Sequence, residues 1–308
     1  METDILLGTG PAEANTLLLV GGDLCARTAQ ALAPERWACI GLRRRTMAAG
    51  PGARVRWLRA DLGDPGSVAE ALAAVSDIAP PPITHLLYAP APDARTPEAY
   101  ARAYPQGLRA LLDALPRPDA VRRCVLVDSS AIWGPVEDDR LVDEDTPPAP
   151  ADFRGAAMLD AEALLHARLP GRGVALRLSG LYGPGRLRLA DGLRAGRIAA
   201  PDGPGHWANR IHVDDAARAC AHLLALAAPL PCYIGTDDRP TPTAALYEAL
   251  ARMAGGPAPA REARPPDGKR LSNARLRASG WTPAWPDALE GYAACLGGSS
   301  ARRVHCLP

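Results

Sequence analysis

The fold of this chain is decided by residues 15–25, which read NTLLLVGGDLC. The first part, NTLLLV, is a continuous apolar run of the kind found in a parallel strand that is buried on both faces. A pair of glycines ends the run, a helical pattern follows at 24–32, and a second strand candidate (WACIGL) covers 37–42. These residues therefore predict a strand, a helix and a second strand.

The same alternation continues along the chain. Further strands are predicted at 55–58, 84–88, 123–127 and 174–178, and further helices at 67–75, 97–115 and 155–169. Strands that alternate with helices of this length are joined by right-handed crossovers, which build a parallel sheet. We therefore expect an α/β fold with a Rossmann-like, doubly wound parallel sheet.

The pattern becomes less regular after residue 180, where loops rich in Gly and Pro separate short elements. We expect residues 1–180 to form the nucleotide-binding core and residues 181–308 to form a smaller C-terminal substrate-binding lobe. The predicted lobe includes a helix at 214–227 and a strand at 232–234. The two parts are expected to interleave as one structural unit.

The composition excludes some partners. The 35 Lys and Arg residues balance 34 Asp and Glu residues, so no charge excess attracts nucleic acid or an anionic membrane surface. The chain begins with acidic METD, and no apolar run approaches the roughly 20 residues of a membrane span, which predicts a cytoplasmic protein. The seven cysteines are widely spread, so we expect reduced thiols and no metal site.

Five segments carry a family resemblance. They are 127–134 (VDSSAIWG), 142–150 (VDEDTPPAP), 177–186 (RLSGLYGPGR), 210–216 (RIHVDDA) and 269–281 (KRLSNARLRASGW). Together they resemble the NAD(P)-dependent epimerase/dehydratase family of extended short-chain dehydrogenases/reductases, and in particular its atypical bacterial members, which are nucleoside-diphosphate-sugar epimerase-like. The resemblance implies a nicotinamide cofactor and a small-molecule substrate.

The phosphate-binding turn departs from the pattern of the fold. A G-x-G-x-x-G turn lets the backbone approach a pyrophosphate at the start of the next helix. Here Val20 and Cys25 replace the first and last glycines, and Gly22 is retained. The candidate cofactor-binding residues of this turn are Gly21, Gly22, Asp23 and Leu24. The alternative is an ordinary turn between strand and helix that binds no nucleotide.

The end of the second strand indicates which cofactor is preferred. Arg43 and Arg44 stand where an NAD-binding site places a carboxylate, and planar guanidinium groups suit a 2′-phosphate. We therefore expect NADP(H) rather than NAD(H), with a solvated basic turn as the alternative. The resemblance also implies that Asp61 lies beside the adenine and that Ala89 and Pro90 run under the nicotinamide ribose.

The family's Tyr-x-x-x-Lys pair is missing. Counting back from Glu162 places Arg154 at the tyrosine position and Met158 at the lysine position. Lys269 is the only lysine in the chain, so no other alignment restores the pair. Arg154 can clamp an anion but is a poor acid or base, and its alternative is a helix-surface arginine.

Other residues remain as catalytic candidates. The resemblance places Ser129, or Ser130 beside it, at the position that hydrogen-bonds the substrate oxygen, although a strand-end cap is the alternative. Trp133 and Met158 would line the substrate pocket. Tyr182 and His212 fall in segments that flank the pocket in relatives, but they can equally brace a turn and a helix start. We expect these residues to surround one cavity.

Three functions follow from these observations. The first is an NAD(P)-dependent epimerase/reductase-like enzyme that acts on a small polar metabolite with non-standard proton transfer. The second is a cofactor-independent lyase, isomerase or cyclase on the same scaffold, and the third is an NADP(H)-sensing regulatory protein. We expect a small-molecule substrate as partner, neither nucleic acid nor membrane, and leave a homodimer open.

Overall fold

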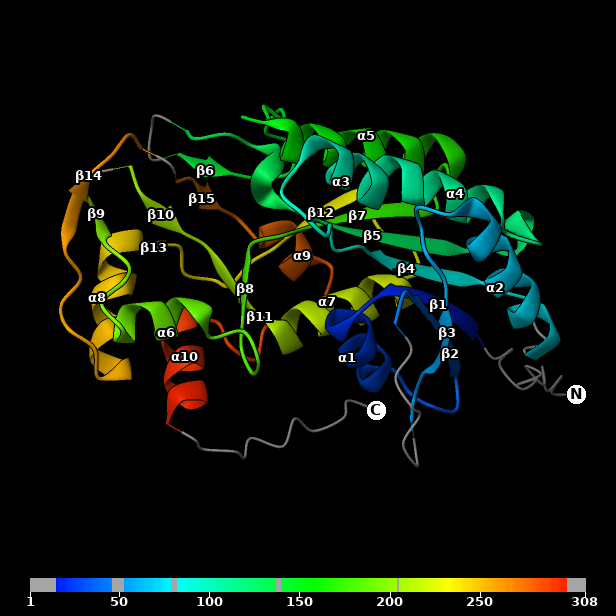
Figure 1. The fold of residues 1–308 in the computed structure, drawn as a ribbon, viewed down its shortest axis with the longest axis horizontal. Coiled ribbons are helices and arrows are strands. Elements are labelled where there is room, and N and C mark those ends of the chain that lie inside the picture. The colour runs from blue at the N-terminus through cyan, green and yellow to red at the C-terminus, as the bar shows by residue number, and fades with distance from the viewer. Residues whose placement is uncertain are drawn as a thin grey trace, which may run out of the picture.

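A seven-stranded sheet runs through the centre of the molecule (Figure 1). The computed structural model describes residues 15–45, 53–78, 82–136, 140–203, 205–266 and 268–297. The strand order is β12-β7-β5-β4-β1-β2-β3, and every neighbouring pair is parallel. The strands are β1 Asn15–Gly21, β2 Trp37–Arg43, β3 Arg56–Arg59, β4 His85–Ala89, β5 Arg123–Ser129, β7 Gly173–Leu178 and β12 Cys232–Gly235.

Helices cover both faces of the sheet, as Figure 1 shows with α2, α3, α4 and α5 above it and α1 and α7 below. Their bounds are α1 Asp23–Ala31, α2 Pro65–Ile78, α3 Pro97–Ala101, α4 Gly107–Asp113, α5 Phe153–Arg168 and α7 Val213–Ala225. Leu18 and Leu19 of β1 are fully buried in the two different core layers, because successive strand residues point to opposite faces. The doubly wound parallel sheet predicted from the sequence is confirmed.

The predicted helix at 97–115 is interrupted. The structure has α3, then a π-helical turn at Arg102–Gln106, then α4. Pro105 lies inside the π-helical turn. A proline has no backbone N–H to donate and its ring crowds the preceding turn, so the α-helical hydrogen-bond pattern shifts at this point.

Two elements that the sequence analysis placed in the lobe belong to the core. The strand β12 pairs with β7 at the edge of the central sheet, and α7 packs against α1 beneath it. The physical reason is the apolar character of both segments, since all of β12 and much of α7 are buried. The chain therefore crosses back into the core after residue 180.

The lobe lies at the left in Figure 1 and contains short elements. Its helices are α6 Arg188–Arg194, α8 Thr243–Ala254 and α10 Ala288–Leu296, while the short α9 Ala274–Ala278 lies against β12. The remaining short strands are β6 Leu141–Val142, β8 Gly180–Tyr182, β9 Ala200–Asp202, β10 Trp207–Ala208, β11 Arg210–His212, β13 Thr241–Pro242, β14 Arg261–Ala263 and β15 Arg270–Leu271. Tyr182, Leu246, Leu250 and Tyr292 form the centre of a separate hydrophobic cluster in this lobe.

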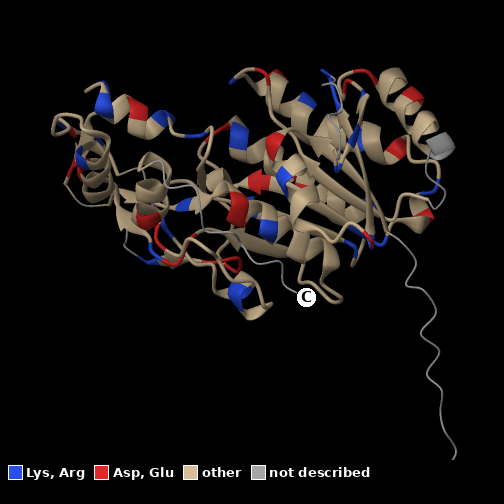
Figure 2. Ribbon diagram, turned by 90° about the horizontal axis from the view of Figure 1, so that it is seen from below, with Lys and Arg blue, Asp and Glu red and all other residues tan. Residues whose placement is uncertain are grey.

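The surface carries both signs of charge. Basic and acidic residues are interspersed over the ribbon in Figure 2, which agrees with the formal net charge of +1. Within the described part of the chain, no helix combines the length and apolar character needed to cross a membrane. The six described cysteines are free thiols, and Cys306 lies outside the described residues.

Candidate functional site

A cleft of about 1340 Å³ opens at the carboxyl ends of β1, β2, β3 and β4. Its floor is formed by Gly21 and Gly22, and its walls are formed by the segments that follow β2, β3 and β4. Open parallel sheets bind their ligands at this edge, where the strands end and the helices begin. The cleft therefore has the position of a nucleotide site.

The glycine turn after β1 has two glycines with different roles. Gly21 has a φ of +145°, and a Cβ there would lie 2.4 Å from the carbonyl oxygen of Ala89 and 3.0 Å from Sγ of Cys25. Gly21 is therefore required for the close approach of β1, β4 and α1. A Cβ on Gly22 would meet no atom within 4 Å, so this residue faces open space at the start of α1.

The turn retains the features that a phosphate group requires. The backbone N–H groups at the start of α1 have no partner within the helix, and Gly22 leaves room for an anion to approach them. Cys25 is fully buried beneath the turn, so it fills the position of the missing third glycine without entering the cleft. Leu24 is also buried, whereas Asp23 is exposed and pairs with Arg27 and Arg186.

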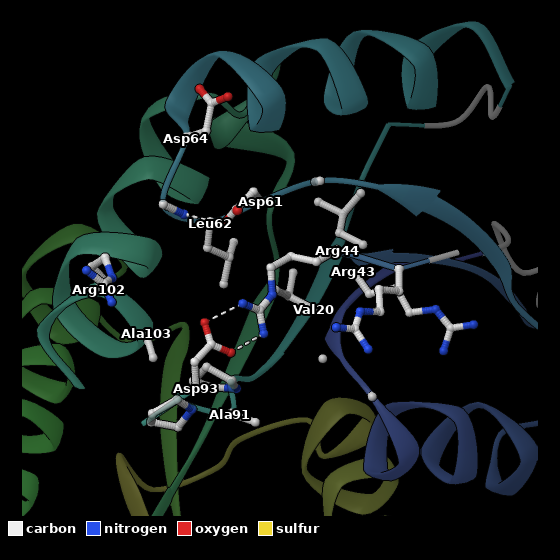
Figure 3. Close-up of a pocket in the computed structure, with 18 of the residues that line it drawn as sticks. Val20, Arg43, Arg44, Asp61, Leu62, Asp64, Ala91, Asp93, Arg102 and Ala103 are labelled. Atoms are coloured by element: carbon white, nitrogen blue, oxygen red, sulfur yellow. Dashed lines mark hydrogen bonds and ion pairs between the residues drawn. The ribbon is translucent and has the colours of Figure 1, made fainter. Parts of the chain in front are cut away.

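The end of the cleft near β2 and β3 is basic. The lining of the whole cleft includes five arginines and three aspartates, namely Arg43, Arg44, Arg45, Arg59, Arg102, Asp61, Asp64 and Asp93. The guanidinium of Arg43 lies 4.2 Å from the ring centroid of Trp57, and Arg44 is paired with Asp93. Figure 3 shows Arg44 in the middle of the cleft, whereas Arg43 lies to one side of it. Arg44 is therefore the better placed of the two predicted arginines.

The other predicted cofactor residues also lie around the cleft. Asp61 follows β3 and accepts a hydrogen bond from the backbone N–H of Gly63 at 2.9 Å. Ala89 ends β4 with its carbonyl oxygen against Gly21, and Pro90 lines the cleft directly after it. The fold thus brings together the ends of three strands that are far apart in the sequence.

Ser129 and Ser130 stand at the end of β5, and both are half-buried. The hydroxyl oxygen of Ser129 accepts a hydrogen bond from the backbone N–H of Ala131 at 3.2 Å. This contact caps the short 3-10 turn Ser130–Ile132, which is the structural role that the sequence left open. A hydroxyl in such a contact can still donate its own proton to a substrate oxygen.

The two predicted pocket residues are buried in the core. Trp133 is 3% exposed, and its indole N–H donates to the carbonyl oxygen of Thr146 at 3.0 Å. Met158 is 4% exposed and packs in the cluster between α5 and the sheet. The position that the sequence analysis assigned to the family's lysine is therefore held by an apolar core side chain.

Arg154 is neutralised by a local partner. Its guanidinium makes several hydrogen bonds with the carboxylate of Asp152, with Nη2 2.6 Å from Oδ2. Asp152 also caps the start of α5, and its bonds with Arg154 lower the pKa of its carboxyl group. The side chain of Arg154 is 40% exposed, so an anionic substrate would have to compete with both Asp152 and water.

Tyr182 and His212 pack against one another. Tyr182 is fully buried, stacks on Tyr292 with ring centroids 4.2 Å apart, and lies edge-on to His212. Burial raises the pKa of the Tyr182 hydroxyl and lowers the pKa of His212. Nδ1 of His212 accepts a hydrogen bond from the backbone N–H of Asp214, which caps α7. The structure thus gives His212 the helix-start role that was its alternative, and it packs Tyr182 into the lobe cluster.

A buried ionic group behind Ser129 was not predicted. Arg177 of β7 and Glu162 of α5 form a bidentate ion pair with distances of 2.6 and 2.8 Å. Asp128 of β5 lies beside them and is 5% exposed. Burial and the neighbouring negative charge of Glu162 raise the pKa of Asp128 well above its ordinary value. The one available signal was an aspartate inside the apolar strand sequence CVLVD.

Lys269 approaches the same region from a distant part of the sequence. Its Nζ donates to the carbonyl oxygen of Trp133 at 2.5 Å, and burial lowers the pKa of its amine to about 8. Lys269 thus adds a titratable amine to the groups around β5. Among the described residues, no group of three or more His, Cys, Asp or Glu side chains is arranged to hold a metal ion.

Comparison with known proteins identifies relatives. Residues 19–231 match the model of the NAD dependent epimerase/dehydratase family. A Streptomyces protein, 3-diazoavenalumate denitrifying reductase, is 33% identical over 179 residues, which are 53% of this chain and 57% of that protein. Protein YeeZ of Escherichia coli K12 is 32% identical over 159 residues, 49% of this chain and 53% of that protein. The chain thus spans little more than half the length of these curated relatives.

Solved structures share the fold over nearly the whole chain. A Methylobacillus flagellatus protein assigned to the NAD-dependent epimerases/dehydratases has a TM-score of 0.73 and 34% identity, covering 92% of this chain and 98% of that one. The UDP-glucose 4-epimerase of Thermus thermophilus, solved in complex with NAD, has a TM-score of 0.73 at 24% identity, with the same two coverages. The second similarity concerns the fold alone.

Proposed function

This chain belongs to the NAD dependent epimerase/dehydratase family, and on that premise we propose that it is an NADP(H)-dependent epimerase/reductase-like enzyme that acts on a small polar metabolite. The observation that carries the proposal is the cleft at the ends of β1 to β4, with an open glycine turn at its floor and arginines at its end. When bound there, the nicotinamide cofactor would supply hydride transfer. The chain's own residues would bind and orient it.

The roles of the residues follow from their positions. Gly22 and the first N–H groups of α1 would hold the pyrophosphate, and Arg44 would hold the 2′-phosphate that distinguishes NADP(H) from NAD(H). The hydroxyl of Ser129 would donate a hydrogen bond to a substrate oxygen at the end of β5. Each of these contacts uses an atom that the fold brings to the carboxyl edge of one sheet.

Proton transfer would follow a route other than the family's Tyr–Lys pair. Arg154 is permanently charged and already paired with Asp152, and Met158 carries no titratable group. The amine of Lys269, whose pKa burial lowers to about 8, is a titratable group near β5 that could take part in this route. Substrate turnover is therefore expected to be slow relative to dinucleotide binding.

A second candidate is an NADP(H)-sensing protein. Three of the candidate residues are buried, which supports it: Met158 lies in the core, Tyr182 in the lobe cluster, and His212 at the end of β11. A protein that binds a dinucleotide but does not turn it over needs the cleft and has no need of a proton donor. The cofactor-independent lyase, isomerase or cyclase hypothesis requires the opposite result, which is turnover without dinucleotide binding.

The experiment is a calorimetric titration of the intact protein with NADPH and with NADH. In the Arg43→Ala/Arg44→Ala variant, NADPH is expected to bind about tenfold more weakly, since hydrogen bonds to a charged group are lost, while NADH changes about twofold or less. Arg117→Ala is the control, because Arg117 is an exposed arginine that precedes β5, at the amino ends of the strands and away from the cleft. Equal weakening of the two cofactors would contradict the NADP(H) preference.

Turnover then separates the candidates. A panel of small polar carbonyl and hydroxyl compounds is screened by thermal shift with NADPH present, and each hit is tested for NADPH oxidation by its fluorescence. Oxidation that is lost in Ser129→Ala, with NADPH affinity unchanged, supports the enzyme. NADPH binding without oxidation for every hit supports the sensor, and absence of binding by the intact protein rules out both.

A further inference from the structure

An ion pair crosses the middle of the cleft. Arg44 follows β2 and Asp93 follows β4, and both guanidinium Nη atoms bond the two carboxylate oxygens of Asp93. Figure 3 shows the two side chains pointing toward one another across the space between these segments. Both residues line the same cleft as Gly21 and Gly22. The pair is thus part of the proposed cofactor site rather than of its surroundings.

Asp93 uses the donors that a phosphate would use. The two Nη groups of a guanidinium form a planar fork that matches either a carboxylate or a phosphate, with two parallel hydrogen bonds. Because Asp93 takes both positions of the fork on Arg44, a 2′-phosphate cannot make the same bidentate contact without displacing it. The carboxylate therefore occupies the place of the ligand group.

The charge and the exposure of the pair indicate that a phosphate can readily displace the Asp93 carboxylate from Arg44. The bond with Arg44 lowers the pKa of Asp93, so the carboxylate is ionised at neutral pH. The side chains of Arg44 and Asp93 are 52% and 54% exposed, and an ion pair this exposed shifts an equilibrium by roughly two- to fivefold. A phosphate carries more negative charge than a carboxylate and can replace it at Arg44.

We propose that Asp93 is a specificity-determining residue, an internal competitor that occupies Arg44 and limits the preference for NADP(H) over NAD(H). This inference rests on the proposed function, because it assumes that the adenosine part of a dinucleotide lies in this cleft. Asp93 lowers the affinity for ligands with a 2′-phosphate and leaves ligands without one nearly unaffected. The loop after β4 thereby tunes a contact made by the end of β2.

The test uses adenosine 2′,5′-bisphosphate and adenosine 5′-monophosphate as probes, titrated calorimetrically into the intact protein. In Asp93→Asn the bisphosphate is expected to bind roughly three- to fivefold more tightly, and the monophosphate within about twofold of the original affinity. The same substitution in an Arg44→Ala background should give less than half of that gain. Asp119→Asn is the control for net charge, because Asp119 is 74% exposed and precedes β5, at the amino ends of the strands and away from the cleft.

Each outcome of these titrations either supports or overturns the proposed role of Asp93. Weaker bisphosphate binding in Asp93→Asn would mean that Asp93 positions Arg44, and unchanged binding would mean that it does not compete; either overturns the inference but leaves the proposed function standing. An equal gain for both probes would show a general charge effect, which also overturns it. If the intact protein binds neither probe nor NADPH, the proposed function fails first. Because both side chains are about half exposed, the variants are expected to fold.

Discussion

Replacing Asp128 with asparagine probes the buried ionic group behind Ser129. Asp128 lies in β5 beside Glu162, which is held in its ionised form by the bidentate contact with Arg177. Burial first, and then the negative charge of Glu162, raise the pKa of Asp128 well above its ordinary value. The folded protein therefore keeps a proton on Asp128 at pH values where the unfolded chain has released it.

The sign of the effect follows from this proton. Where the folded state binds more protons than the unfolded state, the free energy of unfolding falls as pH rises. The fall is about 1.4 kcal/mol per pH unit, and it begins above the unfolded aspartate pKa of about 3.9 and continues up to the folded pKa. Asparagine is an uncharged match for a protonated aspartate and has no proton to release. The variant should therefore gain stability relative to the original protein as pH rises.

The assay is urea denaturation at pH 5, 6 and 7. The difference in unfolding free energy between Asp128→Asn and the original protein is expected to widen as pH rises, by at most about 1.4 kcal/mol per pH unit, with equal urea dependence in both proteins. Asp160→Asn is the control, because Asp160 is an exposed residue on α5, the helix that carries Glu162. Parallel pH profiles for Asp128→Asn and the original protein would refute the reasoning.

Three further substitutions test the buried ion pair and the glycine turn. Glu162→Gln removes the bidentate carboxylate partner of the buried Arg177 guanidinium, so it should lower the unfolding free energy by about 3 kcal/mol in urea denaturation; a loss near zero would contradict the buried ion pair. Gly21→Ala places a Cβ 2.4 Å from the oxygen of Ala89 and should lower the melting temperature strongly, whereas Gly22→Ala meets no atom and should preserve the melting temperature while weakening NADPH binding. Equal melting temperatures for the two alanine variants would show that the turn is not as tight as described.

Local sequence patterns were sufficient to predict the central sheet and the helices that cover it. The apolar runs of β1, β2, β4, β5 and β7 were predicted because a strand buried on both faces has no polar alternation. The glycine turn and the arginines after β2 could also be predicted, because each directly follows a predicted strand in the sequence. Residues near one strand end stay near it in the fold. That is why the cleft at the ends of β1 to β4 was the most predictable part of the candidate site.

The substrate side was less predictable. Tyr182 and His212 lie in segments that resemble pocket-flanking motifs, yet packing against Tyr292 and the cap of α7 decide where their side chains point. Asp152 and Arg154 are two residues apart, but whether they pair depends on how the start of α5 is capped. Such choices depend on neighbours that a motif does not contain.

The sequence by itself determined the parallel sheet, the family resemblance and the arginines that follow the second strand, because each depends on contiguous residues. Only the tertiary structure decided the contacts between distant segments. These contacts are the ion pair of Asp93 with Arg44, the hydrogen bond from Lys269 to the carbonyl oxygen of Trp133, and the pairing of β12 with β7. Residues separated by tens of positions come into contact only when whole helices and strands pack together. The free energy of that packing comes from many side chains, so neither residue of such a contact carries a local signal for it.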